Sequence, residues 1–208
     1  GREAAYPLLH AFLLKHPMSP PAFVLQASIQ EEHGELEEAA FSLRQAIALR
    51  PDVQTIAALG RVLGKQGSLE EAHSLLWDCF EKRDELTQAS AGIELARSLL
   101  VTLTRLERGS EMVEVADQAM ASYGPASVFH YHAVLGTVIQ GDWEAAHHML
   151  EKVIPGLNPR DPLVGKFDQM RQVVDQQRDA GLKPLLSEPT RIRFVKSRPS
   201  QNPAARLH

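Results

Sequence analysis

The stretch AAFSLRQAIALRP, residues 39–51, carries a spacing of small, apolar and proline residues that recurs along the chain. Its Ala39, Leu43, Ala46 and Pro51 stand at the same offsets as Ala5, Leu9, Phe12 and Pro17. A third copy, Ala72, Leu76 and Cys79, begins 33 residues after Ala39. Self-similarity at this period is typical of helix pairs that stack into a solenoid. The sequence therefore predicts an all-α fold built from stacked antiparallel helix pairs.

Helix boundaries in the first complete unit, residues 19–52, follow from its capping and breaking residues. Ser19 is expected to cap the first helix, Gly34 to close it, and Pro51 to end the second helix. In the next unit, residues 53–84, the run from Ser68 to Glu71 reads as a capping box that opens the second helix.

These residues resemble the tetratricopeptide repeat (TPR) family, whose pattern is W-x2-L-G-x2-Y, then A-x3-F, then P. Leu59-Gly60 with Leu63 matches the first helix, and Ala39-x3-Leu43 and Ala72-x3-Leu76 match the second. The resemblance implies a right-handed α-solenoid. Small residues such as Gly60 and Ala72 would let neighbouring helices approach to about 8–10 Å.

The rest of the chain divides less evenly. We expect a TPR-like helical domain over residues 1–181, and then a Pro-containing basic tail over residues 182–208, in which residues 191–196 alternate as in a strand. The domain would start with a half repeat at 2–17 and continue after residue 84 with a degenerate repeat at 85–124, a repeat at 126–159 and a capping helix at 162–180. In the degenerate repeat the glycine spacing stretches to 42 residues, from Gly67 to Gly109. The half repeat indicates a piece of a longer protein, or a protomer that covers its first face by association.

Charge is unevenly distributed over the 208 residues. The net charge is −4, but the segment from Lys183 onward carries six Lys and Arg and one acidic residue, a net of +5, which leaves −9 for residues 1–182. The overall balance gives no reason to expect nucleic-acid binding. No apolar run approaches the roughly 20 residues of a membrane span, so no integral membrane segment is expected. The single cysteine, Cys79, excludes an intrachain disulfide and favours a soluble cytoplasmic protein over a periplasmic one, without fixing the location.

Motifs that would indicate catalysis are missing from the sequence. It contains no HExxH, GxSxG or GxGxxG run, and the weak phosphate-loop likeness of residues 60–66 has Gln66 where Ser or Thr is needed. A cross-helix metal site combining His132 with His147 or His148 is possible, but ordinary surface or half-buried histidines are the favoured interpretation. We therefore predict no catalytic residues, no metal, no cofactor and no enzymatic activity.

In TPR proteins the first helices of successive repeats line a concave groove that holds a partner peptide, and the resemblance implies the same here. The implied groove residues are Val24, Ser28, Glu31, Glu32, Gln54, Ala57, Arg61, Lys65 and Tyr131, with Leu135 and Val138 as weaker candidates. Some family members grip the C-terminal carboxylate of a chaperone with Lys and Asn at fixed positions. Those positions hold Val24, Ser28, Ala57 and Arg61 here, so chaperone-tail binding is not expected.

The leading functional interpretation is a non-enzymatic protein–protein interaction scaffold that binds a partner segment in this groove. One alternative is an accessory or recruitment domain of a larger enzyme or of a secretion or assembly machine. Another is self-association, through the uncapped N-terminal helix or through the basic tail.

Overall fold

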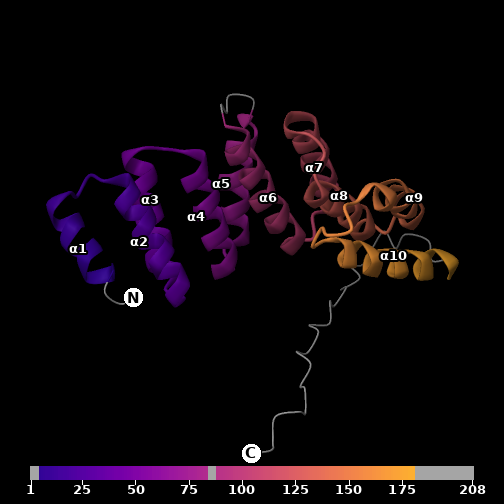
Figure 1. Ribbon diagram of the computed structural model, residues 1–208, viewed down its shortest axis with the longest axis horizontal. Coiled ribbons are helices and arrows are strands. Elements are labelled where there is room, and N and C mark those ends of the chain that lie inside the picture. Colours follow the sequence, from indigo (N-terminus) through magenta and orange to yellow (C-terminus); the bar gives the residue numbers. More distant parts are fainter. Residues whose placement is uncertain (1–4, 84–87, 181–208) are drawn as a thin grey trace, which may run out of the picture.

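The structure, a computed structural model, describes residues 5–83 and 88–180. The helices in these ranges follow one another along the long axis of the molecule (Figure 1). They are α1 (Ala5–Lys15), α2 (Pro20–His33), α3 (Leu36–Leu49), α4 (Val53–Gln66), α5 (Leu69–Phe80), α6 (Ala89–Arg105), α7 (Gly109–Tyr123), α8 (Ser127–Ile139), α9 (Trp143–Val153), the short η3 (Ile154–Gly156) and α10 (Val164–Asp179). The predicted all-α solenoid is thereby confirmed. The predicted tail with its strand-like stretch, residues 2–4 of the half repeat and residues 84–87 lie outside the described residues.

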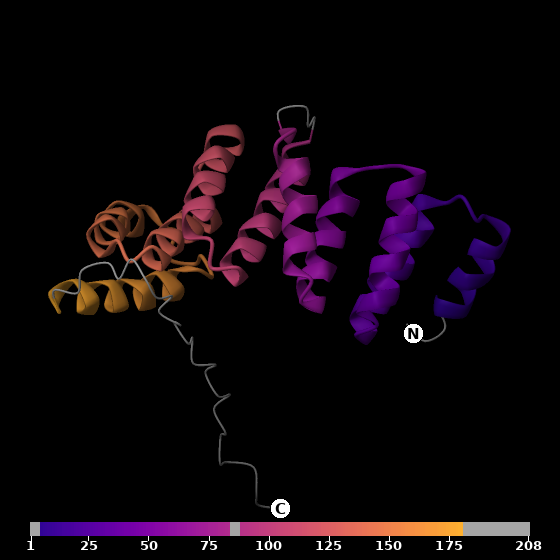
Figure 2. The ribbon, with the colours of Figure 1, turned by 180° about the vertical axis from the view of Figure 1, so that it is seen from behind.

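Each helix packs against the next one in sequence, as in a chain of helical hairpins. In addition α4 packs on α6, α6 on α8, and α8 on α10, so alternate helices from α4 onward are in contact along the molecule (Figure 2). We call the exposed surface of α2, α4, α6 and α8 the first-helix face. The division of the chain into individual repeats remains a prediction.

The turn inside each helical hairpin uses a residue in the left-handed conformation. Gly34 (φ 81°), Gly67 (φ 93°) and Gly141 (φ 74°) take this role in three hairpins, where glycine avoids the Cβ clash. Glu107 (φ 57°) takes it in the fourth. In each case the next residue donates its N–H to a carbonyl five residues back, for example Ser68 to Leu63 at 3.0 Å and Arg108 to Leu103 at 3.1 Å. Among the described residues, the next left-handed turn residue after Gly67 is therefore Glu107, 40 residues later. Gly109, which the glycine spacing pointed to, is not the turn residue.

The glycines inside helices mark close crossings. A Cβ on Gly60 would lie 2.5 Å from the side chain of Leu76, so α4 and α5 meet at a distance that only glycine permits. A Cβ on Gly109 would lie 2.5 Å from the carbonyl oxygen of Gly136, where α7 crosses α8. Gly136 therefore belongs to the α7–α8 crossing and is not the counterpart of Gly60 in the later unit.

Ser19 and Ser68 occupy the predicted N-cap positions of α2 and α5, but neither makes a side-chain cap hydrogen bond. Ser19 makes no side-chain cap bond, because Pro21 in the first turn has no N–H to donate, and Ala22 donates to the Ser19 carbonyl instead at 3.1 Å. Ser68 makes none either, and the supposed partner in its capping box, Glu71, pairs with Arg44 at 2.7 Å. Aspartate caps other helices: Asp52 accepts from Thr55 N at 3.0 Å at the start of α4, and Asp142 accepts from Ala145 N at 3.0 Å at the start of α9.

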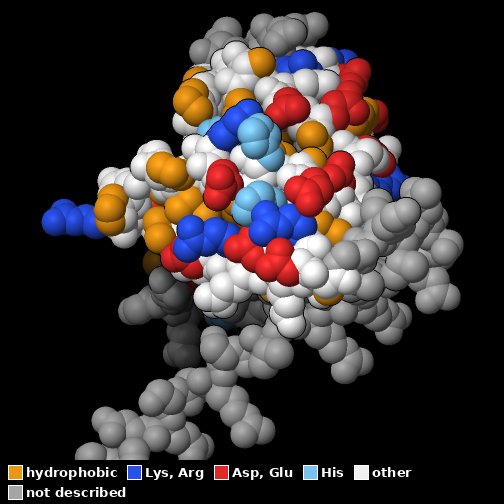
Figure 3. All heavy atoms as spheres, turned by 90° about the vertical axis from the view of Figure 1, so that its right-hand side faces the viewer, with side chains coloured by type: hydrophobic (Ala, Val, Ile, Leu, Met, Phe, Trp, Pro, Cys, Tyr) orange, Lys and Arg blue, Asp and Glu red, His pale blue; other side chains and the backbone are white. Residues whose placement is uncertain are grey.

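The two ends of the solenoid differ in character. At one end α10 lies across the preceding helices and buries Phe167, Met170 and Val174. Val173 is 37% exposed, whereas its neighbour Val174 is fully buried. Figure 3 shows this end, where acidic and basic side chains are intermixed around histidines. Such a polar outer surface is what a capping helix presents to solvent.

The opposite end exposes apolar side chains. Helix α1 buries Leu9 but leaves large hydrophobic residues in contact with solvent. These residues, with their exposed fractions, are Leu8 (72%), Phe12 (46%) and Leu14 (73%), followed by Met18 (73%) just after the helix. Phe12 is therefore half-exposed, although Ala46, at the same repeat position, is buried. Among the described residues α1 packs chiefly against α2, which covers only one of its sides.

Candidate functional site

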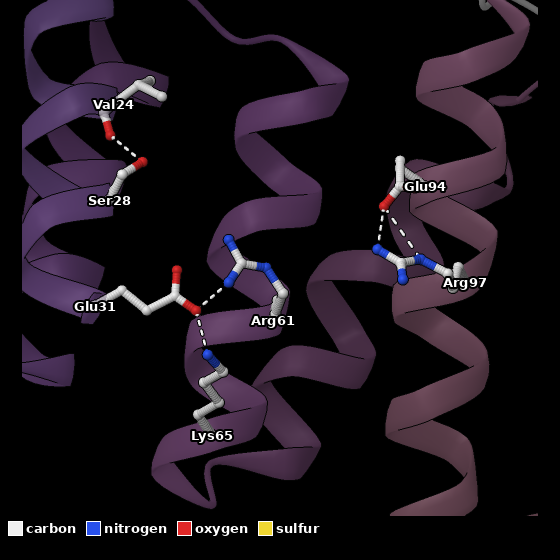
Figure 4. A network of polar contacts seen from close by, with 7 residues as sticks. All are labelled: Val24, Ser28, Glu31, Arg61, Lys65, Glu94 and Arg97. Carbon is white, nitrogen blue, oxygen red and sulfur yellow. Dashed lines mark hydrogen bonds and ion pairs between the residues drawn. The ribbon is translucent and has the colours of Figure 1, made fainter. Parts of the chain in front are cut away.

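A cluster of charged side chains joins α2 to α4 on the first-helix face. Glu31 of α2 accepts hydrogen bonds from Lys65 at 2.6 Å and from the Arg61 guanidinium, both on α4 (Figure 4). The Glu31 side chain is only 9% exposed, whereas Arg61 and Lys65 remain 45% and 53% exposed. One carboxylate thus pairs with two cations and offsets the charge of only one of them, so these three side chains together keep an excess positive charge within reach of solvent.

The other predicted residues of α2 and α4 differ in how accessible they are. Ser28 is exposed and donates its hydroxyl hydrogen to the Val24 carbonyl at 3.0 Å, while the Val24 side chain is half-buried (Figure 4). Glu32 and Gln54 are exposed. Ala57 is 5% exposed, so it contributes to helix packing rather than to a contact surface.

Helix α10 packs on Tyr131 of α8, and the other two predicted residues of α8 are buried. The edge of the half-buried Tyr131 ring meets Phe167 of α10 at 5.6 Å between ring centroids, and Lys166 Nζ lies 5.7 Å from the Tyr131 centroid. Burial raises the pKa of the Tyr131 phenol. Leu135 and Val138 are buried. The accessible part of the first-helix face therefore lies over α2, α4 and α6.

Helix α6 contributes to this face through residues that sequence analysis missed. The four first helices can be aligned on their left-handed turn residues, Gly34, Gly67, Glu107 and Gly141. The residues ten positions before the turn are then Val24, Ala57, Arg97 and Tyr131. The residues six positions before it are Ser28, Arg61, Val101 and Leu135. Arg97 and Val101 thus occupy the positions at which the predicted residues stand in the other units. Val101 is 49% exposed, and Arg97 pairs with Glu94 at 2.6 Å (Figure 4). The turn residue of this hairpin is Glu107 and not a glycine, so the glycine spacing in the sequence could not align α6 with the other first helices.

The assembled face is amphoteric and fixed in place. Three acidic side chains, Glu31, Glu32 and Glu94, share it with three basic ones, Arg61, Lys65 and Arg97. Arg105 of α6 donates to the carbonyl of Gly64 on α4. This contact ties the two helices together, so the face has a preformed arrangement of charge.

The histidines weighed as metal ligands are engaged elsewhere. His132 is buried, with Nδ1 3.2 Å from the Thr104 hydroxyl, and burial together with the nearby Lys166 lowers its pKa to about 4. His147 Nδ1 lies 2.8 Å from Asp175. Within residues 5–83 and 88–180, no group of three or more His, Cys, Asp or Glu side chains is arranged to hold a metal ion. Burial also raises the pKa of the Cys79 thiol, which lowers the fraction present as reactive thiolate.

An open pocket of about 440 Å³ lies on another side of α2, between α1 and α3. It combines apolar walls with amide and carboxylate groups. The lining residues are Leu13, Phe23, Gln26, Gln30, Glu37, Glu38, Phe41 and Ser42. None of them is among the predicted groove residues, because the repeat pattern points only to the first-helix face. We call this site the N-terminal pocket.

Comparison with known proteins identifies the class of fold. No protein-family model and no curated protein sequence matches the chain. Solved structures do match. YrrB, described as a TPR protein with an unusual peptide-binding site, is 16% identical, with a TM-score of 0.59 over 82% of this chain and 84% of YrrB. PilF of Pseudomonas aeruginosa is 16% identical, with a TM-score of 0.62 over 88% of this chain and 86% of PilF.

The chain therefore has a TPR-like fold over most of its length, and the predicted resemblance is confirmed at the level of the fold. In the part of the chain that the structure describes, no helix has both the length and the apolar content needed to cross a membrane.

Proposed function

We propose that this chain is a non-enzymatic scaffold that binds a segment of a partner protein along the first-helix face of α2, α4 and α6. The observation that carries the proposal is that the residues six before each left-handed turn on three consecutive first helices, Ser28, Arg61 and Val101, are all exposed. The exposed cations Lys65 and Arg97 lie on the same helices α4 and α6 (Figure 4). Repeat proteins use such extended surfaces to bind other chains.

The charges on the face indicate the chemistry of the partner. Arg61 and Lys65 share the single carboxylate of Glu31 and remain about half exposed. A second carboxylate, from an Asp or Glu of the partner, would complete this pairing with charge-assisted hydrogen bonds. Val101, about half exposed and six residues before its turn like Arg61, offers an apolar contact one helix further on. A segment with an acidic residue followed by an apolar one fits this order, since complementary charge sets orientation and selectivity.

The test compares two charge-reversed baits in affinity capture. Arg61→Glu with Lys65→Glu alters the first-helix face, while Arg44→Glu with Lys82→Glu makes the same change in net charge at exposed residues of α3 and of the turn after α5. We expect the native chain and the control variant to recover the same partner, and the first-helix variant to lose it. Recovery of that partner by all three baits would place the binding site elsewhere.

Reversing both charges places two further carboxylates beside the nearly buried Glu31, so loss of folding needs separate control. The triple variant Glu31→Gln, Arg61→Gln, Lys65→Gln removes the charges while keeping hydrogen-bonding side chains of similar size. We expect it to retain the helical circular dichroism of the native chain and still lose the partner. Full binding by the triple variant would show that charge at this cluster does not contribute.

A further inference from the structure

We propose that the N-terminal pocket binds the basic segment of residues 191–196 from a second copy of this chain. The site is separate from the first-helix face and would join copies head to tail.

The pocket offers two kinds of surface to a ligand. Phe41, 61% exposed, the half-buried Phe23 and Leu13 of α1 form its apolar walls. Glu37 and Glu38, in the first turn of α3, add exposed carboxylates. A ligand that presents hydrophobic groups beside cations would bury the exposed Phe41 ring and place its charges next to the carboxylates.

The segment of residues 191–196 has this combination. Its sequence is Arg-Ile-Arg-Phe-Val-Lys. In an extended conformation alternate side chains point to opposite sides, so Ile192 and Phe194 would face away from Arg191 and Arg193. The region from Lys183 onward carries +5, whereas residues 1–182 carry −9. Long-range attraction therefore favours contact between this tail and the helical domain of any copy.

The length of the connecting chain points to a neighbouring copy. Helix α10 lies along the long axis and ends at the side of the molecule remote from α1 (Figure 1). Its 16 residues measure about 24 Å, and the three steps between α2, α4, α6 and α8 add at least about 24–30 Å at ordinary helix spacings. The 11 residues from Ala180 to Arg191 reach about 40 Å at most when fully extended. The pocket of the same chain is thus out of reach, while that of a second copy is not.

An interface of this kind is heterologous, because the pocket of one copy meets the tail of the next. In an open assembly the two end copies keep one unused pocket and one unused tail, so association continues until a ring closes, and the smallest ring is a dimer that exchanges both tails. The mean mass in solution should therefore rise with protein concentration.

Charge reversal in the full-length chain tests the proposal by sedimentation velocity from low to high micromolar concentration. We expect the native chain to associate, and both Glu37→Lys/Glu38→Lys and Arg191→Glu/Arg193→Glu to remain monomeric. A mixture of these two variants should associate again, because the unaltered tail of the pocket variant then meets the unaltered pocket of the tail variant. The matched control is Glu70→Lys/Glu71→Lys, which makes the same change in the first turn of α5 as Glu37→Lys/Glu38→Lys makes in the first turn of α3. This control should associate like the native chain.

Several outcomes would overturn the proposal. They are a native chain that stays monomeric throughout, equal loss of association in the Glu70/Glu71 control, and failure of the mixture to recover. A nitroxide label on the tail shows directly where the tail binds. The label is attached to the new cysteine of a Cys79→Ser, Ser197→Cys chain, which is mixed with an unlabelled, isotopically enriched native chain. We expect the label to broaden the NMR signals of Phe23 and Phe41 in the native chain. Broadening at Glu31 and Glu32 instead would put the tail on the first-helix face.

Discussion

Replacing Gly60 by alanine should destabilise the solenoid, whereas the same change at Gly64, one turn further along α4, should not. A Cβ at residue 60 would lie 2.5–2.7 Å from three side-chain atoms of Leu76, which is fully buried. The nearest such contact at residue 64 is Arg105 Nη1 at 3.9 Å, an ordinary van der Waals distance.

The magnitudes follow from two opposing effects. Alanine is favoured over glycine in a helix interior by about 1 kcal/mol, which applies at both positions. Overpacking of a core contact costs about 1–3 kcal/mol, and more where the neighbour cannot relax. We therefore expect Gly60→Ala to lower the free energy of unfolding by up to about 2 kcal/mol, and Gly64→Ala to raise it by up to about 1 kcal/mol.

Urea unfolding followed by circular dichroism measures this difference. A double-mutant cycle with Leu76→Ala identifies its cause, because removing the Leu76 side chain should make Gly60→Ala neutral or stabilising. If Gly60→Ala is as stable as Gly64→Ala in the native background, or if the cycle shows no coupling, the close α4–α5 crossing is not what requires glycine.

Three further predictions concern the core, one turn and one buried histidine. Ala72→Leu should cost about 1–3 kcal/mol in thermal unfolding because Ala72 is fully buried, while Ser74→Leu on the same helix should change little. Glu107→Gly should stabilise by up to about 1 kcal/mol, since glycine suits its φ of 57°, and destabilisation would contradict the turn assignment. The pKa of His132 is about 4 in the folded chain and ordinarily 6.5, so the unfolded chain binds the extra proton and stability should fall as pH drops below about 6.5. Between about pH 7 and pH 5 the loss should be about 2 kcal/mol, and His132→Gln should abolish it whereas His148→Gln should not.

Much of the fold follows from local patterns that sequence alone displays. The recurring Ala-x3-Leu spacing sets which face of α3 and α5 is buried, and Ala39 and Ala72 are indeed fully buried. The middle of the chain was harder because a glutamate can adopt the left-handed turn at Glu107 when the surrounding packing holds it there. Without glycine as a marker, the position of α6 relative to its neighbours could not be read from spacing.

The candidate site was predictable where the repeat spacing is regular and not where the turn lacks a glycine. Arg61 and Lys65 lie at repeat positions that point to the first-helix face, and the structure brings Glu31 to both of them. Arg97 and Val101 could be added only once the turn at Glu107 was known. The N-terminal pocket depends on how α1 sits against α2 and α3, which no periodicity specifies.

Photo-crosslinking tests the central claim, that the first-helix face binds the partner, most directly. A photoreactive amino acid at Val101 would sit on that face, and one at Asp78, exposed on α5, would sit outside it. The account predicts that Val101 crosslinks to the captured partner and that Asp78 does not. Crosslinks from Asp78 with none from Val101 would contradict it.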